Sequence, residues 1–411
     1  MSESVRIFLK AGEEKELQQG FPWVFDNEIE TVRQAKASVP YSECTVPDGE
    51  IVDVFSKAGA FVSCGVLNKK SRIALRLLGN VHAEEFRVNT KKLISERVRN
   101  AVNIRRLLFS ETDSYRLIFG EADFIPGLVA ERFYSRGKVY IVVQFLSLSC
   151  EIFRNEIIDS IKNACSPDAI YERSDASVRE KEGLEQRSGW IFNSGDEVIQ
   201  IEENGIKLEV DIAHGQKTGY FLDQKFNRMQ IRKFCKGKRV LDTFTHTGAF
   251  GLNAAAGGAR EVISCDISEE AVNMVKRNIE LNGASSKMTS VCADVFDLLK
   301  KYETDGEKFD VIILDPPAFT KSAKMIQKAY GGYKEINLRA MRILNEGGIL
   351  ITCSCSHYFD QEVFYPMLVH AAKDAHKNVQ VLQKRGAAPD HPVLLGYPQS
   401  EYLKCAICRV L

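Results

Sequence analysis

Four aspartates stand at the ends of apolar runs in the second half of the chain. The runs are KRVLDTF, REVISCD, MTSVCAD and FDVIILD, and the residues are Asp242, Asp266, Asp294 and Asp315. Helical segments such as SEEAVNMVKRNIELN separate the runs, and apolar strands that alternate with helices are typical of a parallel α/β sheet. Ligands of such sheets bind beyond the carboxyl ends of the strands. We therefore expect the four carboxylates to line one crevice.

The first of these strands runs into a turn of small residues, DTFTHTGAFG, which opens a helix. Gly248 in this turn would let a ligand approach the backbone closely. The turn lacks the G-x-G-x-x-G of dinucleotide sites and the GK[ST] of the P-loop. An acidic residue here would repel a phosphate, so the turn favours a cofactor with a cationic amino-acid end.

S-adenosylmethionine presents the groups that fit these carboxylates: an ammonium, a sulfonium, a ribose and an adenine. Asp266 is placed to accept hydrogen bonds from both ribose hydroxyls, and Asp294 is placed to accept one from the adenine amino group. The alternative is that each strand-end aspartate only caps the next helix. The predicted contacts with the cofactor along these strands are Asp242, Thr247, Gly248, Asp266, Ile267, Asp294, Val295, Asp315 and Pro316.

The segment DPPAF, which begins at Asp315, follows the fourth strand. Its two prolines fix a rigid turn with few N–H groups, and such a turn can present Asp315 and backbone carbonyls to a flat base. The alternative is a stiff strand exit that binds nothing. Phe319 is compatible both with stacking on a base and with a place in the core.

A fifth apolar run ends in TCSCSH, residues 352–357. Residues two apart on a strand point to the same side, so Cys353 and Cys355 share a face and Cys355 lies nearer the carboxyl end. A thiolate there can attack C6 of a pyrimidine and create the carbon nucleophile at C5 that accepts a methyl group. A strand cysteine is otherwise a small buried hydrophobe. Only the methyltransferase context favours catalysis, and His357 could tune the thiol or simply lie at the surface.

The pair Cys405 and Cys408 belongs to an apolar terminal run. No second CxxC or histidine pair completes a zinc site, and residues three apart on a strand face opposite sides. We interpret the pair as structural and predict no metal site.

The chain has 411 residues, enough for two or three domains. It contains 55 Lys and Arg and 55 Asp and Glu. A surface that is basic throughout is therefore excluded, whereas a local basic patch is not. No apolar run reaches the roughly 18 residues of a membrane span. The first residues lack the basic and then apolar segments of a signal peptide. The number of cysteines, eleven, is odd, which does not suit a complete set of disulfides, so we expect a cytoplasmic protein.

Three domains are predicted. Residues 1–80 read as about five short strands, typical of a small barrel. Residues 81–190 combine a helix over Ala83 to Leu108 with further strands and an amphipathic helix, and end near loop-like residues 188–197. Residues 191–411 form the parallel α/β domain, to which KNVQVLQKRG and EYLKCAICRVL add a strand pair at one end of the sheet.

At these motifs the chain resembles the RlmI-like bacterial large-subunit rRNA methyltransferases. The resemblance runs in order through GFPWVF, DFIPGLV, ERSDASVREKEGL, ENGIKLEVD, GQKTGYFLDQKFNR, LDTFTHTGAF, DPPAF, TCSCSH and EYLKCAICRV. It covers essentially the whole chain, and GQKTGYFLDQ is its most specific part.

The resemblance implies an N-terminal RNA-binding PUA domain, a middle α+β domain and a Rossmann-like class I methyltransferase domain that uses S-adenosylmethionine. It implies methylation of cytosine C5 in rRNA, with Cys355 as nucleophile and Asp315 bonded to the base near N3. It makes Phe221 and Gln224 cofactor contacts, although both are also compatible with a packed helix start. Some RNA cytosine-5 enzymes carry a second cysteine after Asp-Pro-Pro, where this chain has Ala318, so a two-cysteine release mechanism is not supported.

RNA contact on a neutral chain must come from a patch. Basic residues cluster in the first domain, and others lie on the following helix; such runs are otherwise solvated faces. A base buried in folded RNA would have to be flipped out. The predicted RNA contacts are Lys69, Lys70, Arg72 and Arg76, with Arg99, Arg105 and Arg106 on the helix.

Three other functions stay open at this point. An amino-group methyltransferase of adenine or guanine needs no cysteine, but its [D/N]-P-P is followed directly by an aromatic residue, whereas Ala318 intervenes here. A non-catalytic RNA-binding assembly factor would keep the fold without turnover. Methylation of uracil C5 shares the covalent mechanism. The base that removes the C5 proton and the oligomeric state, a homodimer included, are not assigned.

Overall fold

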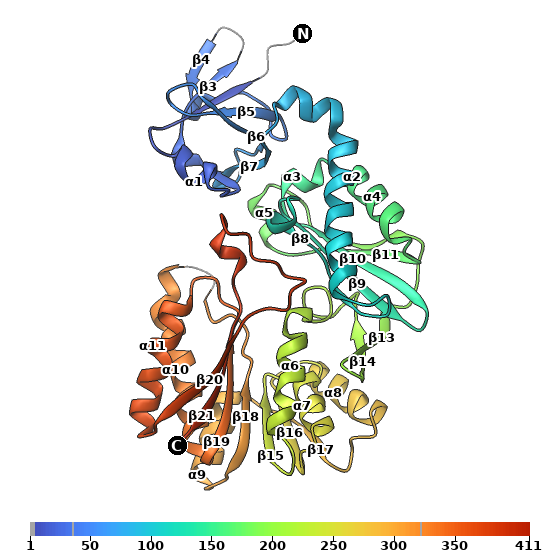
Figure 1. Ribbon diagram of the computed structural model, residues 1–411, viewed down its shortest axis with the longest axis vertical. Coiled ribbons are helices and arrows are strands. Elements are labelled where there is room, and N and C mark those ends of the chain that lie inside the picture. Colours follow the sequence, from blue (N-terminus) through green and yellow to red (C-terminus); the bar gives the residue numbers. More distant parts are fainter. Residues whose placement is uncertain (1–4, 35–36, 321–322) are drawn as a thin grey trace. The chain divides into compact units, whose positions relative to one another are not determined.

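The computed structural model describes residues 5–34, 37–320 and 323–411 (Figure 1). Residues 1–4, part of the start that we compared with a signal peptide, lie outside the described residues. The chain forms two compact units. Unit 1 comprises Met1–Glu197, Asp211–Gly219 and Pro389–Ser400, and unit 2 comprises Val198–Val210, Tyr220–Ala388 and Glu401–Leu411. The three predicted domains, with boundaries near residues 80 and 190, stay a prediction.

The N-terminal part of unit 1 is a seven-stranded sheet in the order β2-β7-β6-β5-β1-β3-β4. Its inner face is apolar, with side chains such as Ile7, Val52 and Leu75 buried. The sequence predicted about five strands here, and the structure has seven. The bounds are β1 (Arg6–Leu9), α1 (Glu14–Gln18), β2 (Trp23–Phe25), β3 (Ile29–Gln34), β4 (Ala37–Pro40), β5 (Ile51–Phe55), β6 (Phe61–Leu67) and β7 (Ile73–Gly79).

A long helix, α2 (Ala83–Leu108), follows with the bounds that its apolar spacing predicted. It packs on a second sheet of unit 1, whose order is β12-β11-β10-β9-β8. The elements are β8 (Tyr115–Phe119), β9 (Leu128–Ser135), β10 (Lys138–Phe145), α3 (Leu148–Glu151), α4 (Arg154–Cys165), β11 (Ala169–Ser174), α5 (Val178–Lys181) and β12 (Arg187–Phe192).

The prediction of a loop over residues 188–197 was wrong in its first half. Arg187–Phe192 forms β12, the edge strand that pairs antiparallel with β11. Its residues are exposed or only partly buried, so the segment lacks the apolar pattern that would have marked it as a strand. Pairing with β11 makes it one.

Residues 389–400 lie in sequence between two strands of unit 2 but pack within unit 1. The buried Arg105 donates to the main-chain oxygen of Asp390 at 2.7 Å, and the Asp390 carboxylate accepts from the backbone N–H of Arg116 at 2.8 Å. Further along the segment, the ring of Tyr397 meets that of Trp23 at 4.9 Å. The segment is thus fixed by polar contacts at one end and aromatic contacts at the other.

Unit 2 is built on a seven-stranded sheet in the order β17-β16-β15-β18-β19-β21-β20. The first five strands are parallel and β21 is antiparallel to both its neighbours. The strands are β15 (Arg239–Thr243), β16 (Glu261–Asp266), β17 (Met288–Cys292), β18 (Phe309–Leu314), β19 (Leu344–Ser354), β20 (Val379–Arg385) and β21 (Lys404–Val410), and β13 (Val198–Glu203) and β14 (Ile206–Asp211) form a separate pair.

Helices cover both faces of this sheet, with α10 and α11 on one side and α6 to α8 on the other (Figure 1). The core on the first side joins Leu314 and Leu350 of the sheet to Tyr333 and Met367 of the helices. The predicted parallel α/β fold with a strand pair at one end is therefore confirmed. The helices are α6 (Lys225–Ile231), α7 (Ala249–Ala256), α8 (Glu269–Leu281), α9 (Val295–Thr304), α10 (Ile326–Ile343) and α11 (Gln361–Ala375), with a 3₁₀ turn, η4 (Leu222–Gln224), before α6.

Candidate active site

The four predicted aspartates lie at the same edge of the unit 2 sheet. The strands β17, β16, β15 and β18 lie side by side in this order, and the chain order reverses between β15 and β18. Such a reversal is where ligands of doubly wound sheets bind. The structure therefore brings four predicted residues to one edge: Asp294, Asp266, Asp242 and Asp315.

Asp242 is fully buried under the turn that follows β15. Its Oδ2 accepts hydrogen bonds from the Thr245 hydroxyl, from the backbone N–H of Gly251 (2.9 Å) and from Ser264 Oγ (3.1 Å). Burial raises the pKa of Asp242 to about 6. Its Oδ1 has no hydrogen-bond partner among the described residues. This carboxyl group shapes the turn through one oxygen, and a cationic ligand could bind the other.

Two glycines allow the turn to lie this close to the sheet. Gly248, the residue before α7, has a φ of +81°, a left-handed conformation that favours glycine. A Cβ at Gly251 would lie 2.4 Å from Ser264 Oγ and 3.0 Å from Asp242 Oδ2. Thr247 is buried in the same turn. Small residues are therefore required by the geometry of this turn.

Asp266 ends β16 and contacts the same turn. Its Oδ2 accepts from the backbone N–H of His246 (2.9 Å) and its Oδ1 from that of Ser268 (3.1 Å). A carboxylate oxygen has two lone pairs, so each oxygen can still accept a bond from a hydroxyl. The next residue, Ile267, is 68% exposed. An accessible apolar side chain beside a carboxylate fits a nucleoside.

Asp294 caps α9, as the alternative interpretation of the strand-end aspartates expected. Its Oδ1 accepts from the backbone N–H of Phe296 (2.7 Å) and, more weakly, from that of Asp297 (3.4 Å). Both bonds use Oδ1, so capping does not exclude a ligand on Oδ2. Val295 is buried in the core, and its side chain contacts protein.

Asp315 follows β18 directly and is partly exposed. Its Oδ1 accepts from Gln224 Nε2 at 2.9 Å, and Gln224 Oε1 accepts from Asn227 Nδ2 at 2.7 Å. Burial, reinforced by the charge of Asp223, raises the pKa of Asp315 to about 7. Pro316 is buried. The structure thus joins two residues that the sequence assigned to the site from separate motifs.

Phe221 begins the segment that carries Gln224. Its ring lies 5.0 Å from that of His246, edge to face, and its main-chain oxygen accepts from Arg228 at 2.7 Å. Arg228 is buried and forms two parallel bonds to Glu203, at 2.6 and 2.8 Å. Both charged residues lie inside motifs of the family resemblance, ENGIKLEVD and GQKTGYFLDQKFNR, but the motifs alone assigned them no role. The two residues lie 25 positions apart in polar stretches, so the sequence carried no signal that they pair.

The two strand-five cysteines differ in environment. Cys355 comes directly after β19 and is partly exposed, whereas Cys353 is fully buried. Burial, followed by the neighbouring Cys405 thiol, raises the pKa of Cys353 well above its usual value. Because the thiolate is the reactive form, Cys353 is unsuited to nucleophilic attack. None of the eleven cysteines, all within the described residues, forms a disulfide.

Tyr333 of α10 contacts the side chains of both neighbours of Cys355. Its hydroxyl is 3.1 Å from Ser354 Oγ and 3.0 Å from Ser356 Oγ. Tyr333 is buried, and its place beside Cys355 could not be predicted because one tyrosine in an amphipathic helix carries no distinguishing signal. Both neighbours of Cys355 are therefore held to α10 through their side chains.

Phe319 and His357 lie beside this region. Phe319 packs in the core, with ring distances of 4.6 Å to Tyr333 and 6.0 Å to Phe296. Of the two roles that the sequence allowed for Phe319, the structure favours the core. His357 is exposed, and its ring lies 5.4 Å from that of Tyr402.

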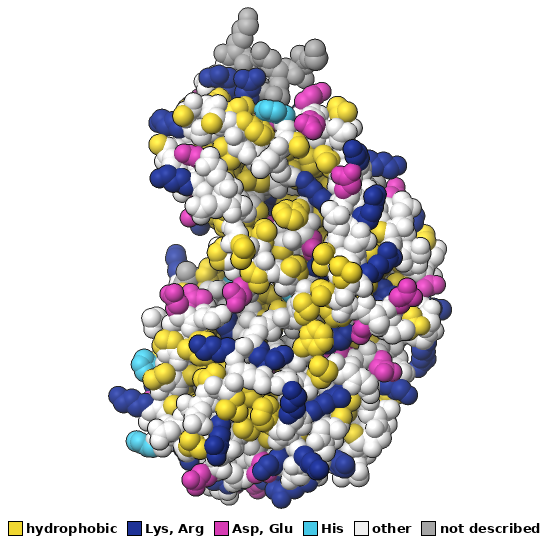
Figure 2. All heavy atoms as spheres, viewed as in Figure 1, with side chains coloured by type: hydrophobic (Ala, Val, Ile, Leu, Met, Phe, Trp, Pro, Cys, Tyr) yellow, Lys and Arg dark blue, Asp and Glu magenta, His cyan; other side chains and the backbone are white. Residues whose placement is uncertain are grey.

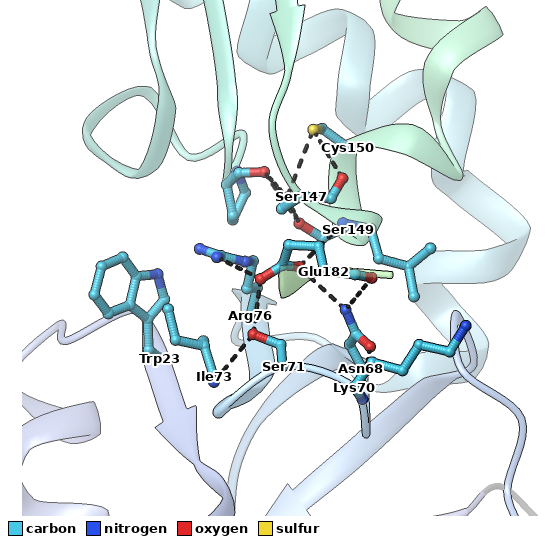
Figure 3. Close-up of polar contacts among 12 residues, drawn as sticks. Trp23, Asn68, Lys70, Ser71, Ile73, Arg76, Ser147, Ser149, Cys150 and Glu182 are labelled. Carbon is cyan, nitrogen blue, oxygen red and sulfur yellow. Dashed lines mark hydrogen bonds and ion pairs between the residues drawn. The ribbon is translucent and has the colours of Figure 1, made fainter. Parts of the chain in front are cut away.

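Of the residues predicted to contact RNA, Lys69, Lys70 and Arg72 are exposed, but Arg76 is not. Arg76 is buried and bonds to Glu121 at 2.8 Å. It also bonds to Glu182 at 3.0 Å (Figure 3). A buried guanidinium with two carboxylate partners cannot reach a phosphate in solvent. We therefore correct the prediction and leave Arg76 out of the RNA surface.

Glu182 is the centre of the network that holds Arg76. Its carboxylate also accepts from Ser71 Oγ at 2.8 Å and from Asn68 Nδ2 at 3.1 Å (Figure 3). The network connects β7 and its preceding turn to the segment after α5. Its function is to hold these parts of unit 1 together.

The basic residues predicted on α2 also include both exposed and buried side chains. Arg99 and Arg106 are exposed, whereas Arg105 is buried and paired with Asp123 at 2.6 and 2.8 Å. On the face shown in Figure 2, Lys and Arg side chains are spread among acidic and uncharged ones. Basic residues on that face do not merge into one large patch.

Other classes of site are not evident in the described residues. No group of three or more His, Cys, Asp and Glu there is arranged to hold a metal ion. No helix in the same part of the chain is both long enough and apolar enough to cross a bilayer. A surface hollow of about 490 Å³ in unit 1, lined by residues including Tyr140 and Asp168, contains none of the predicted site residues.

Two family models match the chain. Residues 176–393 match a family described as S-adenosylmethionine-dependent methyltransferase, and residues 7–80 match a PUA-like domain. The expected N-terminal PUA domain and the methyltransferase domain are thus confirmed.

Curated relatives match over their full length. The chain is 39% identical over 412 residues to ribosomal RNA large subunit methyltransferase I of Escherichia coli O139:H28, covering 99% of this chain and 100% of the relative. It is 40% identical over 411 residues to the protein of the same name in Photobacterium profundum, covering 98% and 99%.

Solved structures share the fold at lower identity. A putative S-adenosylmethionine-dependent methyltransferase from Streptococcus mutans superposes with a TM-score of 0.80 at 21% identity, covering 98% of this chain and 99% of that one. A putative methyltransferase complexed with S-adenosylhomocysteine superposes with a TM-score of 0.79 at 20% identity and the same coverage.

Proposed function

The chain belongs to the S-adenosylmethionine-dependent methyltransferase family that includes ribosomal RNA large subunit methyltransferase I, and we propose from this premise that it methylates C5 of a cytosine in large-subunit rRNA. The observation that carries the proposal is the pairing of two chemical groups on adjacent strands. Cys355 follows β19 and Asp315 follows β18, and these strands are parallel neighbours. A partly exposed thiol beside a carboxyl group of raised pKa suits covalent catalysis on a pyrimidine.

The cofactor is S-adenosylmethionine, and the residues at the sheet edge fit it. Asp242 keeps a buried oxygen without a partner among the described residues, which fits a cationic group. Asp266 and Ile267 offer a carboxylate beside an apolar surface for the nucleoside, and Gly248 allows close approach to the backbone. When bound, the cofactor supplies the methyl group.

Asp315 is suited to protonate the base. With its pKa raised to about 7, a large share of Asp315 is protonated at neutral pH. A protonated carboxyl group donates a hydrogen bond, which N3 of cytosine accepts, whereas N3 of uracil carries a hydrogen. Gln224 donates to Oδ1 of Asp315, so we assign Oδ2 to the base. A hydrogen-bond donor at this position favours cytosine over uracil.

The covalent step follows from these assignments. The Cys355 thiolate forms a bond to C6 of the base, the C5–C6 double bond opens, and the proton of Asp315 passes to N3 as charge develops on the ring. C5 then carries the electron pair that accepts the methyl group. Water or an aspartate takes the C5 proton, the double bond re-forms, and the bond between sulfur and C6 breaks to return the thiolate. The proton on N3 returns to Asp315.

We assign the first contacts with RNA phosphates to Lys69, Lys70 and Arg72, which are exposed in the PUA-like domain. Phosphate contacts provide affinity without base specificity. The target base must leave its stack, because attack on C6 requires access to the face of the ring.

The competing reaction, methylation of an amino group, is less well supported. That chemistry places an aromatic side chain against the base just after Asp-Pro-Pro. Here Ala318 intervenes and Phe319 is engaged by Tyr333 and Phe296 in the core. Methyl transfer to an amino group needs no cysteine, so that reaction would give the partly exposed Cys355 no catalytic role.

Mapping of rRNA modifications tests the proposal. Large-subunit rRNA from cells with and without this protein is digested and analysed by mass spectrometry that separates 5-methylcytidine, 5-methyluridine and N-methylated purines. We expect one or more 5-methylcytidines to disappear and to return when the purified protein acts on the unmodified rRNA. Loss of an N-methylated purine instead would establish the competing reaction, and no loss of any methylated nucleoside would favour a non-catalytic assembly factor.

A further inference from the structure

The motif EYLK near the C-terminus has no role in the proposed reaction, yet its side chains contact two of the site's segments. Tyr402 donates to Asp223, the residue before Gln224, at 2.5 Å. Lys404 donates to the main-chain oxygen of Ser356, the residue after Cys355, at 2.7 Å. The motif thus links the segment that orients Asp315 to the segment that carries the nucleophile.

Lys404 has an uncommon environment for a lysine. Only 3% of it is exposed, and it begins β21 opposite Ser354 of β19. Its ammonium donates to two main-chain oxygens, of Ser356 and of Tyr402, both at 2.7 Å. Among the described residues no carboxylate forms an ion pair with it. A buried ammonium without a counter-ion lowers the stability of the fold. We therefore expect this lysine to have a functional role.

The negative charge that Lys404 can meet is that of a Cys355 thiolate. Burial lowers the pKa of Lys404 to about 8, and the charge of Cys355 acts in the opposite direction, ahead of those of Asp360 and Glu401. Lys404 is therefore still mostly protonated at neutral pH. From α10, Tyr333 approaches the same segment with a neutral hydroxyl bonded to Ser354 and Ser356.

We infer that Lys404 is a positioning residue for the nucleophile: its buried ammonium fixes the main chain after Cys355 and stabilises the thiolate form of that residue. The inference rests on the proposed function, in which Cys355 is the attacking group. Nearby cations increase the thiolate fraction and the reactivity of cysteines. Lys404 contacts neither the base nor the cofactor in this assignment, and it acts through Cys355.

Alkylation of the full-length protein tests this inference without RNA or cofactor. The rate of Cys355 carbamidomethylation by iodoacetamide is measured by peptide mass spectrometry from pH 6 to 10 for wild type, Lys404→Met and Lys404→Arg. We expect the midpoint for Cys355 to rise by about one pH unit in Lys404→Met, with an approximately tenfold slower reaction at pH 7. Lys404→Arg keeps a charge and should lie between the two. Lys384→Met is the matched control, because Lys384 is exposed on β20 over the ring of Tyr365.

The outcomes are distinct. An unchanged Cys355 midpoint in a folded Lys404→Met protein would overturn the inference. If Lys404→Met does not fold, Lys404→Arg decides. A Cys355 midpoint above that of wild type together with slower methyl transfer at unchanged KM supports the inference, and unaltered kinetics in both assays contradict it. If the proposed function fails, Cys355→Ser retains methyl transfer while the alkylation shift in Lys404→Met can still appear, so the two failures are distinguishable.

Discussion

The amide nitrogen of Gln224 lies 2.9 Å from Oδ1 of Asp315, so a residue ahead of α6 orients the carboxyl group at the tip of β18. Gln224 is held in turn by Asn227 at 2.7 Å. This hydrogen bond favours the ionised form of Asp315, whereas burial and the charge of Asp223 favour the protonated form. The balance places the pKa near neutrality, where a proton can be both given and taken back.

Gln224→Glu should move the pH dependence of methyl transfer. A second carboxyl group at this distance raises the pKa of Asp315 further, so the limb on which activity falls with rising pH should shift upward by about one unit or more. Single-turnover methylation from pH 5.5 to 9 measures the limb. Gln380→Glu, on the exposed face of β20, is the control. An unshifted limb in Gln224→Glu would mean that Asp315 is not the proton donor.

The two cysteines should respond differently to substitution. Cys355→Ala should abolish methyl transfer, by at least about a thousandfold, because the covalent step is lost. Cys353→Ala should retain transfer within several-fold while lowering stability by about 1–2 kcal/mol through a small cavity. RNA containing 5-fluorocytidine, which blocks loss of the C5 substituent, should trap a denaturation-resistant adduct with wild type and with Cys353→Ala only. Transfer by Cys355→Ala would refute the covalent mechanism.

Asp242→Asn should change how stability depends on pH. The folded pKa of Asp242, about 6, is above the ordinary value. The native state therefore binds more protons between about pH 4 and 6, and stability falls as pH rises through that window. The free energy of unfolding of the variant, relative to wild type, should rise from pH 4 to 7 by up to about 3 kcal/mol. Urea unfolding at each pH measures it.

Asp310→Asn is the matched control for this effect. Burial disfavours its charge, but hydrogen bonds from the Arg239 backbone and the Asn345 amide outweigh burial and hold the pKa of Asp310 below its usual value. Its stabilising contribution is present above the unfolded pKa and is lost as pH falls through the folded pKa. The variant should therefore lose stability relative to wild type at neutral pH. The same sign in both variants would show that the shift of Asp242 is not caused by burial.

Replacement of Lys69, Lys70 and Arg72 by alanine should weaken RNA binding at all sequences. Each lost phosphate contact should reduce the slope of log affinity against log salt by about 0.7–0.9. Filter binding at several salt concentrations measures the slope. Arg76→Met should leave the slope unchanged but cost about 3–5 kcal/mol of stability, because Glu121 and Glu182 lose a buried partner. A salt slope reduced by Arg76→Met would restore that residue to the RNA surface.

The sheet of unit 2 was predictable because its central strands, such as β18, are buried on both faces and read as continuous apolar runs. The long helix Ala83–Leu108 was predictable from its apolar spacing. β12 was not, because an edge strand with exposed residues has no such pattern. The extra strands of the first sheet, β3 and β4, escaped for the same reason, since few of their side chains are buried.

The sequence motifs predicted which residues belong to the site, but they did not reveal which residues these would contact. The order of strands put Asp266 and Asp315 at one edge, whereas the bond from Gln224 to Asp315 joins positions 91 residues apart. The burial of Arg76 depends on Glu182, which lies 106 residues away. Contacts over such separations are tertiary, and a single chain without its fold does not reveal them.

Residues 389–400 interrupt unit 2 between β20 and β21, and their own contacts, through Asp390 with Arg105 and Tyr397 with Trp23, belong to unit 1. No single cut therefore separates a catalytic fragment from the rest: a piece starting at residue 191 would carry a loop whose carboxyl and aromatic groups have lost their partners. Recombination at one point in a gene would break the same contacts. Transplanting unit 2 alone requires two new, short turns, from Val210 to Tyr220 and from Ala388 to Glu401.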